Sequence, residues 1–380
     1  MNIKLTSTMT IGLLAFTCLL NGASADEVTI ERSGKSIELS GSIQIEGQDQ
    51  SLLFEADDGQ LWIVKPEEIQ SKQESESSAD PIAQDELATT LLAELPDGFR
   101  ALKKKHYVIA YQTELAYAKW IAGLYESRLY PAFEKFWDRK KVELTKSKYP
   151  LVIIIFANRP EYERYATREL GEPPGSTVAY YNLMTNRVAM FDLTADQAVA
   201  GQGDDRKLDE ILSDPRAIPM VATIIHEATH QLIFNRGMQQ RLADTPLWLN
   251  EGLALFFEAP DLRSKRGWRT PGRINEPRLD LFISNHANRP ADAIAKMVSD
   301  DARFQTAETG LAAYADAWAF NYFLLKRKPR EFAAYLKHMS THKPQVTVTP
   351  QQRLADFTRF FGDDLESLER DFIKYMKKLR

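Results

Sequence analysis

Apolar and polar side chains alternate through residues 27–64, and turn-forming residues such as Asp58-Gly59 interrupt the alternation. A period of two is typical of strands that bury one face, and Asp-Gly is a common hairpin turn. The pattern predicts a small all-β module over residues 26–66. A structural or packing unit is the favoured interpretation of this module, and a ligand-binding unit is the alternative.

The next segment, residues 67–86, is acidic, rich in serine and poor in large apolar residues. Such a composition buries little surface and is typical of a connection between folded units. We therefore predict an acidic, Ser-rich linker with a short helix over residues 67–95.

From residue 96 the hydrophobic pattern alternates between strand-like and helix-like stretches, and after Pro246 it becomes mostly helical. The fold class that this predicts is α+β, with an α+β half over residues 96–246 and a helical half over residues 247–380. The expected elements are strands at 106–113 and 150–158, a strand pair within 175–193, and helices at 114–135, 160–170, 247–259, 312–326 and 330–339, with a final helix pair around residue 362.

The first 25 residues contain Lys4, an apolar stretch over residues 9–20 and the small-residue end Ala23-Ser24-Ala25. This is the pattern of a secretory signal peptide cleaved before Asp26, so we expect an exported protein of the periplasm, the cell envelope or the extracellular space. Cleavage would remove Cys18, the only cysteine, and leave a chain without disulfides. A lipid anchor at Cys18 is the less favoured alternative, because the residues before it are not all small.

The whole chain of 380 residues has a net charge of −5, which becomes −6 when Lys4 is removed with the signal. A negative balance argues against nucleic acid as a partner. No apolar run after the signal approaches the length needed to cross a bilayer, so no transmembrane segment is expected once the signal is cleaved. The 44% hydrophobic composition is enough for two domains with one sizeable core.

Residues 226–230 read HEATH, which places two histidines four apart with a glutamate directly after the first. Side chains at positions i and i+4 share one face of a helix, so His226 and His230 can bind a single metal ion. Glu227 projects to one side of that face, where a carboxylate can accept a proton from an activated water. The motif predicts a zinc hydrolase with Glu227 as its general base.

A catalytic zinc ion usually has three protein ligands, so the two histidines need a third group from elsewhere. Glu251, in the sequence WLNEGLA, is the candidate. The HExxHxxGxxH variant is excluded, because Ile233 and Arg236 stand where that variant has glycine and histidine.

HEATH followed by NEGLA resembles the gluzincins, the thermolysin-like zinc metallopeptidases of clan MA. A second similarity is carried by the stretches WLNEGLALFFEAPDLRSKRGWRTPGRIN, SDDARFQ, AYADAWAFNYFLL and RLADFTRFFG. Through them, residues 96–380 resemble a family of uncharacterised secreted bacterial proteins, the domain of unknown function 1570. The resemblance implies a thermolysin-like catalytic unit with Zn²⁺ held by His226, His230 and Glu251, a cleft between its two halves, and a peptide or protein substrate.

The resemblance also suggests roles for residues outside the ligand set. Tyr314 lies where M1-type aminopeptidases carry a tyrosine that stabilises the transition state, although Tyr314, Trp318 and Tyr322 can equally form one packed stripe. In gluzincins a strand upstream of the metal-binding helix aligns the substrate, so residues 187–191 are the hypothesised substrate-aligning edge. An ordinary internal strand is the alternative.

The hydrogen-bond partners of the two histidines are less clear from sequence. Thermolysin-like enzymes carry an aspartate four residues after the glutamate ligand, and this chain has Leu255 there. Asn250, Glu258 and Asp316 are the candidates for the missing partner. A basic segment surrounds Trp268, and we interpret it as a solvated loop rather than a substrate-binding rim; its charged residues are Arg263, Lys265, Arg266, Arg269 and Arg273. We interpret the remaining histidines as structural or surface residues; they are His106, His286, His338 and His342.

Together these patterns predict a secreted zinc-dependent peptidase. The alternative is a non-catalytic envelope protein that keeps a zinc site for folding or for binding a partner. Glu227 favours catalysis, because a purely structural site needs no general base. The patterns do not address the oligomeric state.

Overall fold

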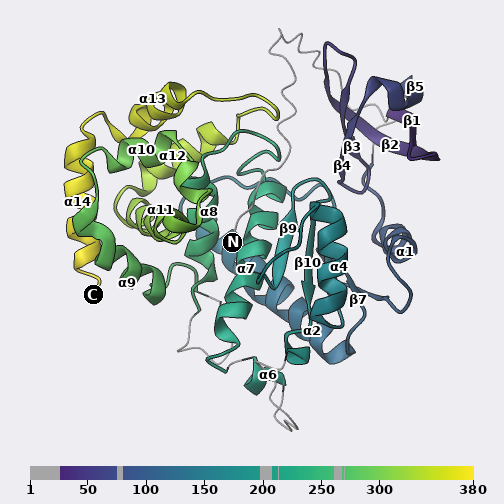
Figure 1. Cartoon of the computed structure of the whole chain (residues 1–380), viewed down its shortest axis with the longest axis horizontal. Coiled ribbons are helices and arrows are strands. Elements are labelled where there is room, and N and C mark those ends of the chain that lie inside the picture. Colours follow the sequence, from purple (N-terminus) through teal and green to yellow (C-terminus); the bar gives the residue numbers. More distant parts are fainter. Residues whose placement is uncertain (1–25, 75–79, 197–207, 213, 261–267, 269) are drawn as a thin grey trace.

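The computed structural model describes residues 26–74, 80–196, 208–212, 214–260, 268 and 270–380. The predicted signal peptide, with Lys4 and Cys18, lies outside these residues, as do Arg263, Lys265, Arg266 and Arg269 of the basic segment. An N-terminal antiparallel sheet is followed by a second sheet and then by a helical C-terminal half (Figure 1). The predicted α+β class is therefore confirmed.

The first sheet has the strand order β4-β3-β2-β1-β5, and its neighbouring strands are antiparallel. Its small core contains Val28, Ile30 and Phe54, each almost completely buried. The predicted linker begins too early, because residues 69–74 form β5 and pair with β1 rather than running free. The strands are β1 (Asp26–Arg32), β2 (Lys35–Glu46), β3 (Leu52–Ala56), β4 (Leu61–Val64) and β5 (Ile69–Glu74), with the short 3-10 segment η1 (Pro66–Glu68) before β5.

This N-terminal module contacts the second sheet through specific polar groups. The backbone N–H of Leu61 donates to the carbonyl of Met184 at 2.7 Å. Arg241, which follows the helix that carries the HEATH motif, forms an ion pair with Glu55 at 3.0 Å. The module is therefore attached to the turn that precedes β10 and to the chain that follows the candidate metal-binding helix.

The second sheet has the order β6-β7-β8-β10-β9, in which β7, β8 and β10 run parallel and the two edge strands run antiparallel to their neighbours. The predicted substrate-aligning edge at residues 187–191 is wrong, because these residues form β10, which lies between β8 and β9. The edge strand next to it is β9. The strands are β6 (Arg100–Lys103), β7 (Tyr107–Tyr111), β8 (Leu151–Phe156), β9 (Ala179–Asn182) and β10 (Arg187–Phe191).

Helices cover both faces of this sheet. On one face the ring of Phe191 packs 5.6 Å from the ring of Tyr162 in α4, and α1 packs against β7. On the other face Tyr125 donates from its hydroxyl to the carbonyl of Ile224 in α7 at 3.0 Å. The elements are α1 (Gln84–Glu94), α2 (Leu115–Leu124), the π-helical turn η2 (Tyr125–Leu129), α3 (Tyr130–Arg139), α4 (Arg159–Leu170), η3 (Leu193–Ala195), α6 (Leu208–Ile211) and α7 (Ile218–Asn235).

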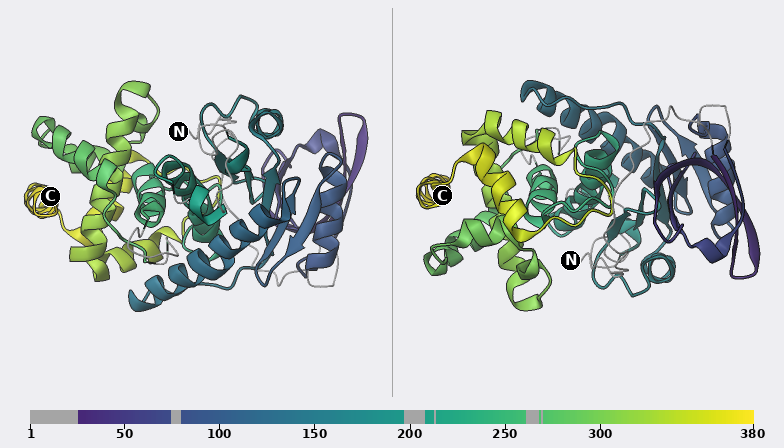
Figure 2. Two further views of the ribbon diagram at one scale, coloured as in Figure 1. Left: turned by 90° about the horizontal axis from the view of Figure 1, so that it is seen from below. Right: turned by 90° about the horizontal axis from the view of Figure 1, so that it is seen from above.

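The C-terminal helices gather at the opposite end of the molecule from the N-terminal sheet (Figure 2). The longest of them, α11, packs closely on α8, which carries Glu251. That approach depends on Gly252, because a Cβ atom there would lie 1.9 Å from Nδ2 of Asn321. The elements are α8 (Leu247–Glu258), α9 (Glu276–Asn285), η4 (His286–Asn288), α10 (Ala293–Ser299), η5 (Ala302–Phe304), α11 (Ala307–Arg327), α12 (Pro329–Met339), α13 (Pro350–Phe361) and α14 (Leu365–Lys377).

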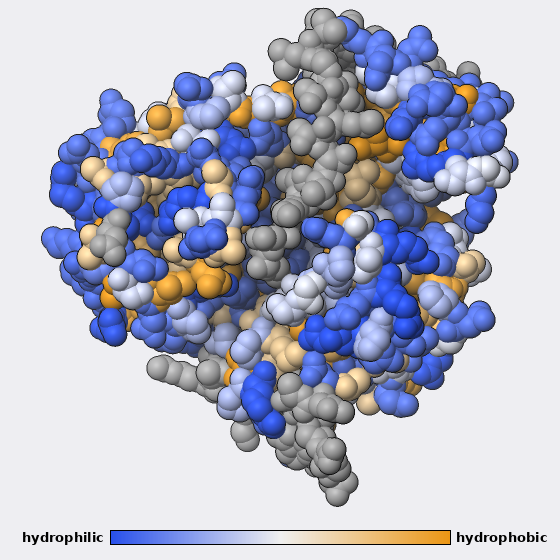
Figure 3. Space-filling model, in the orientation of Figure 1, coloured by the Kyte–Doolittle hydropathy of each residue, from blue (hydrophilic) through white to orange (hydrophobic). Residues whose placement is uncertain are grey.

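Hydrophilic residues dominate the face of the molecule drawn in Figure 3, with smaller hydrophobic patches between them. Among the described residues the exposed large hydrophobic side chains are Ile63, Leu115, Leu311 and Val346, which come from four separate parts of the chain. Within the same residues, every helix is too short or too polar to cross a bilayer.

Candidate metal centre

The helix α7 presents the two histidines of the HEATH motif. It begins at Ile218 with Pro219 in its first turn, where the missing proline N–H costs no helical hydrogen bond. Most of its other side chains are apolar, and the buried ones among these are Val221, Ile224, Ile225, Ala228, Leu232 and Ile233. The helix packs between the second sheet and α8. His226 and His230 lie one turn apart, and their Nε2 atoms are 3.1 Å from each other. Both imidazoles therefore offer a nitrogen to the same point in space.

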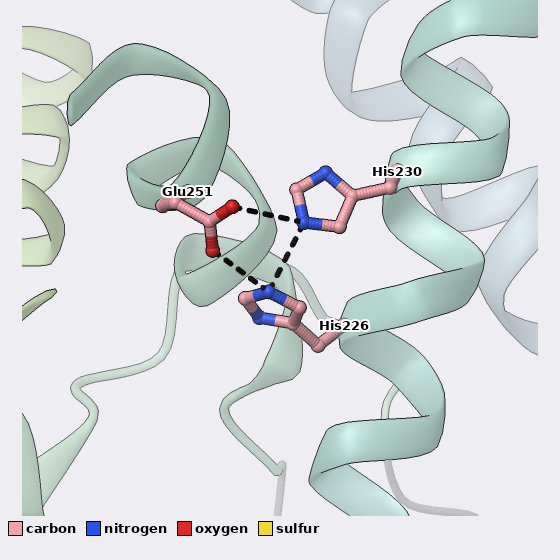
Figure 4. A group of neighbouring side chains, drawn as sticks. All are labelled: His226, His230 and Glu251. Atoms are coloured by element: carbon pink, nitrogen blue, oxygen red, sulfur yellow. Dashed lines mark hydrogen bonds and ion pairs between the residues drawn. The ribbon is translucent and has the colours of Figure 1, made fainter. Parts of the chain in front are cut away.

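Glu251 reaches that point from α8 in the helical half (Figure 4). Its Oε2 lies 3.2 Å from Nε2 of His226, and its Oε1 lies 3.7 Å from Nε2 of His230. All three side chains are buried. The structure thus brings together the three side chains predicted as metal ligands, where the sheet-bearing half meets the helical half.

The spacing of these atoms suits a metal cation. A tetrahedral zinc ion with bonds of about 2.0–2.2 Å keeps its ligand atoms roughly 3.3–3.6 Å apart, and the observed separations are 3.1, 3.2 and 3.7 Å. Oε1 of Glu251 is buried and makes no hydrogen bond to any described residue. A buried carboxylate oxygen without a donor is costly unless a cation satisfies it. The donor set of two imidazoles and one carboxylate is one that Zn²⁺ prefers.

Each histidine has a hydrogen-bond partner on its other ring nitrogen. Nδ1 of His226 lies 2.9 Å from Oε2 of Glu258, and Nδ1 of His230 lies 3.2 Å from Oδ1 of Asn250. Both partners are acceptors, so both Nδ1 atoms donate and both Nε2 lone pairs can face the metal. Of the three sequence candidates for this role, Asn250 and Glu258 fill it. Asp316 does not, because it pairs with Arg289 at 2.6 Å and Arg303 at 2.8 Å.

Glu258 is itself held in place by the chain that follows α8. Its Oε1 accepts a hydrogen bond from Nδ2 of Asn275 at 2.9 Å. Its backbone carbonyl accepts from Nε1 of Trp268 at 2.8 Å. Trp268 is therefore an anchor for the end of α8, which is a structural role for the one aromatic residue in the basic segment.

Glu227 is buried beside the ligands, and its two carboxylate oxygens have different surroundings. Oε2 accepts a hydrogen bond from the backbone N–H of Tyr181 in the edge strand β9 at 2.9 Å. Oε1 is buried and has no hydrogen-bond donor among the described residues. One oxygen is fixed by the sheet while the other keeps its acceptor capacity.

Burial and charge shift the pKa values of this group in the metal-free protein. Burial raises the pKa of Glu227 to about 7. Burial alone would lower the pKa of His226, but the carboxylates of Glu251 and Glu258 outweigh it and raise the pKa to about 10. Burial lowers the pKa of His230 to about 4. One imidazole thus carries a proton beside Glu251, which is the position that a cation would otherwise occupy.

Tyr314 lies in α11, buried near the ligand set. Burial raises the pKa of its phenol, and the negative charges of Glu251 and Glu227 raise it further. Its ring contacts Phe304, with centroids 5.3 Å apart, and the guanidinium of Arg278. Trp318 and Tyr322 continue the same helix and pack against each other. Tyr314 therefore packs against Phe304 and Arg278 and also lies within electrostatic range of the candidate centre.

The four remaining histidines fall into two groups. His106 pairs with Glu126 at 2.6 Å, and Nδ1 of His286 lies 2.5 Å from the carbonyl of Ile283, as expected for structural residues. His338 and His342 instead gather around one aspartate, Asp356. Their spacing of four, the same as in HEATH, is a sequence signal for this grouping.

One contributor to the first centre was not identified from the sequence. Glu258 was among the sequence candidates, and it lies two helical turns after Glu251 on the same face of α8. The backbone N–H of Tyr181 has no sequence signature, because any residue except proline supplies that donor.

The chain was compared with known families and proteins. Residues 220–346 match a family described as a protein of unknown function, DUF1570. The match begins within α7 and includes all three candidate ligands and Tyr314. It agrees with the resemblance to domain of unknown function 1570 and specifies no activity. A search of curated proteins found no match.

Proposed function

We propose that this chain is a secreted zinc-dependent peptidase. The observation that carries the proposal is the buried, unpartnered Oε1 of Glu227 next to three convergent metal-ligand atoms. A site that only stabilises the fold has no use for such a carboxylate, and burying it without a partner costs free energy. A buried carboxylate with a free oxygen can instead act as a general base that accepts a proton from a water molecule.

Zn²⁺ bound by Nε2 of His226, Nε2 of His230 and the carboxylate of Glu251 would supply the Lewis acidity that makes water nucleophilic near neutral pH and polarises a carbonyl group. Glu227 accepts the proton of the attacking water and then delivers it to the nitrogen of the leaving amine. The Tyr181 N–H donates a hydrogen bond to Oε2 of Glu227 at 2.9 Å, so the carboxylate stays in one orientation while Oε1 accepts and then releases the proton.

Tyr314 is proposed as the hydrogen-bond donor to the carbonyl oxygen of the scissile bond, which becomes negatively charged during attack. Its raised pKa keeps the phenol protonated at neutral pH, so its O–H can donate. This assignment places Tyr314 on α11 and Glu227 on α7, from the two halves of the catalytic unit.

The edge strand β9 is the proposed element that aligns the substrate. An extended peptide can add to a sheet edge through backbone hydrogen bonds, and β9 is the outer strand on this side of the second sheet. Because β9 also holds Glu227 through Tyr181, a peptide lying along it would be close to the general base. This favours peptides or proteins in extended conformation as substrates.

The test compares the wild-type chain with Glu227→Gln, which keeps the shape of the side chain and removes its basicity. Zinc content is measured by elemental analysis, and hydrolysis is measured on a mixed library of peptides. We expect equal zinc content and a loss of hydrolysis of about 10²–10⁴-fold. Equal hydrolysis by both proteins would overturn the mechanism. A zinc-loaded wild type that cleaves nothing in the library would favour the alternative, a non-catalytic protein that keeps the site for folding or for a partner.

A further inference from the structure

A second group of potential metal ligands lies in the helical half, away from the first centre. His338 is in the last turn of α12, His342 follows that helix, and Asp356 is in α13. Nε2 of His338 lies 3.0 Å from Oδ1 of Asp356, and Nε2 of His342 lies 3.7 Å from Oδ2. We propose that these three side chains form a second divalent-cation site, with Zn²⁺ as the fitting ion.

The arrangement is not explained by hydrogen bonds alone. Nε2 of His338 and Nδ1 of His342 are both buried, and neither makes a hydrogen bond to any described residue. Although Nε2 of His338 is near Asp356, the approach does not have the geometry of a hydrogen bond. Nε2 of His338 faces the carboxylate of Asp356 without a hydrogen bond, and Nε2 of His342 lies 3.7 Å from the same carboxylate. A metal ion can complete this arrangement, since it binds each donor through its lone pair.

The surroundings set the character of the site. The two imidazole rings are 5.3 Å apart and nearly perpendicular, and the ring of Phe360 lies 5.5 Å from that of His338. The side chains are 13–25% exposed, in contrast to the 1–3% of the three ligand side chains of the first centre. Water can therefore supply the remaining coordination position, and we expect a bound ion to exchange more readily here than at His226, His230 and Glu251.

An ion in this position would connect α12 to α13, and both helices support the helix that carries Glu251. Trp248 of α8 stacks on Tyr335 of α12, with centroids 6.0 Å apart, and packs edge-on against Phe357 of α13 at 5.9 Å. Tyr335 lies one turn before His338, and Phe357 is adjacent to Asp356. The second site would thus stabilise the packing around the first turn of α8 without touching a substrate.

The test measures zinc stoichiometry on the full chain, after dialysis against a buffer that holds free Zn²⁺ constant, by elemental analysis. The variants are His342→Ala and the more conservative Asp356→Asn. A matched control is His286→Ala, which removes a partly exposed histidine outside both groups. We expect about two equivalents of zinc in the wild type and the control, and about one in each variant. Glu251→Gln should also lose one equivalent, but from the first centre.

A second measurement keeps the proposal testable if one variant folds poorly. Zinc should raise the thermal midpoint of the wild type more than that of Asp356→Asn, while the two proteins should melt alike in chelator, because a ligand stabilises only the state that binds it. Two equivalents in both His342→Ala and Asp356→Asn would overturn the site. One equivalent in the wild type that both His342→Ala and Asp356→Asn retain, or none in the wild type, would also overturn it and leave the cluster as an ion pair only. These results do not depend on peptidase activity, since none of the three residues belongs to the first centre.

Discussion

Nδ1 of His226 donates a hydrogen bond to Oε2 of Glu258 at 2.9 Å, so a candidate ligand on α7 is oriented by a carboxylate two helical turns beyond Glu251 on α8. The same helix therefore supplies both a candidate metal ligand and the group that orients another one. This connection fixes the rotation of the His226 ring and increases the basicity of its Nε2. It also makes the geometry of the centre depend on the packing of α7 against α8.

Glu258→Gln should weaken zinc binding at the first centre by roughly 10-fold or more, because the neutral amide no longer favours the electron-rich form of the His226 ring. Competition with a chromogenic chelator measures the affinity. Glu276→Gln, an exposed position on α9, is the control and should bind zinc like the wild type. An unchanged zinc affinity in Glu258→Gln would show that Glu258 only holds Asn275 in place and does not influence the metal centre.

Gly252→Ala should destabilise the fold by about 1–3 kcal/mol, because overpacking forces backbone shifts in a close helix contact. The added Cβ would lie 1.9 Å from Nδ2 of Asn321 and 2.6 Å from the carbonyl of Ala317. Gly123→Ala is the matched control, since a Cβ on that helical glycine meets nothing within 4 Å, and it should stabilise by about 0.5–1 kcal/mol. Chemical denaturation measures both. A neutral Gly252→Ala would show that α8 and α11 are not in close contact.

Tyr314→Phe should leave zinc content unchanged and lower kcat by about 10²–10³-fold, with little change in KM, if its hydroxyl stabilises charge that develops only in the transition state. Tyr322→Phe removes a hydroxyl from the same helix, two turns further on, and should keep wild-type kinetics. If both variants behave alike, Tyr314 is a packing residue and the catalytic assignment fails.

Removal of zinc from the first centre should lower the thermal midpoint, because the cation compensates the buried charge of Glu251. At a free zinc concentration of about 100 times Kd, bound metal stabilises the folded state by about 2.7 kcal/mol. The measurement uses His342→Ala, so that only the first centre contributes, with chelator and then with zinc restored. A thermal midpoint that changes neither with chelator nor with restored zinc would contradict metal binding by His226, His230 and Glu251.

Several elements follow from local pattern and agree with the structure to within a few residues. The predicted helix at 247–259 is α8 (Leu247–Glu258), and the predicted strand at 150–158 is β8 (Leu151–Phe156). The helix expected from residue 312 begins earlier, at Ala307, because Thr306 caps it by accepting a hydrogen bond from the N–H of Thr309. By contrast, β5 lies in a stretch read as linker, since its composition is polar and its stability comes from pairing with β1.

By itself, the sequence determined what repeats over a helical turn: two histidines on one face, a glutamate beside them, and a candidate third ligand in a separate apolar helix. Helical hydrogen bonds join residues only four apart, so such patterns can be recognised from the sequence alone. Only the tertiary structure decided that Asn250 and Glu258, rather than Asp316, orient the histidines, and that β9 rather than β10 is the sheet edge. Those outcomes depend on which surfaces bury each other, and that choice is a sum of many weak contacts between residues far apart in the chain.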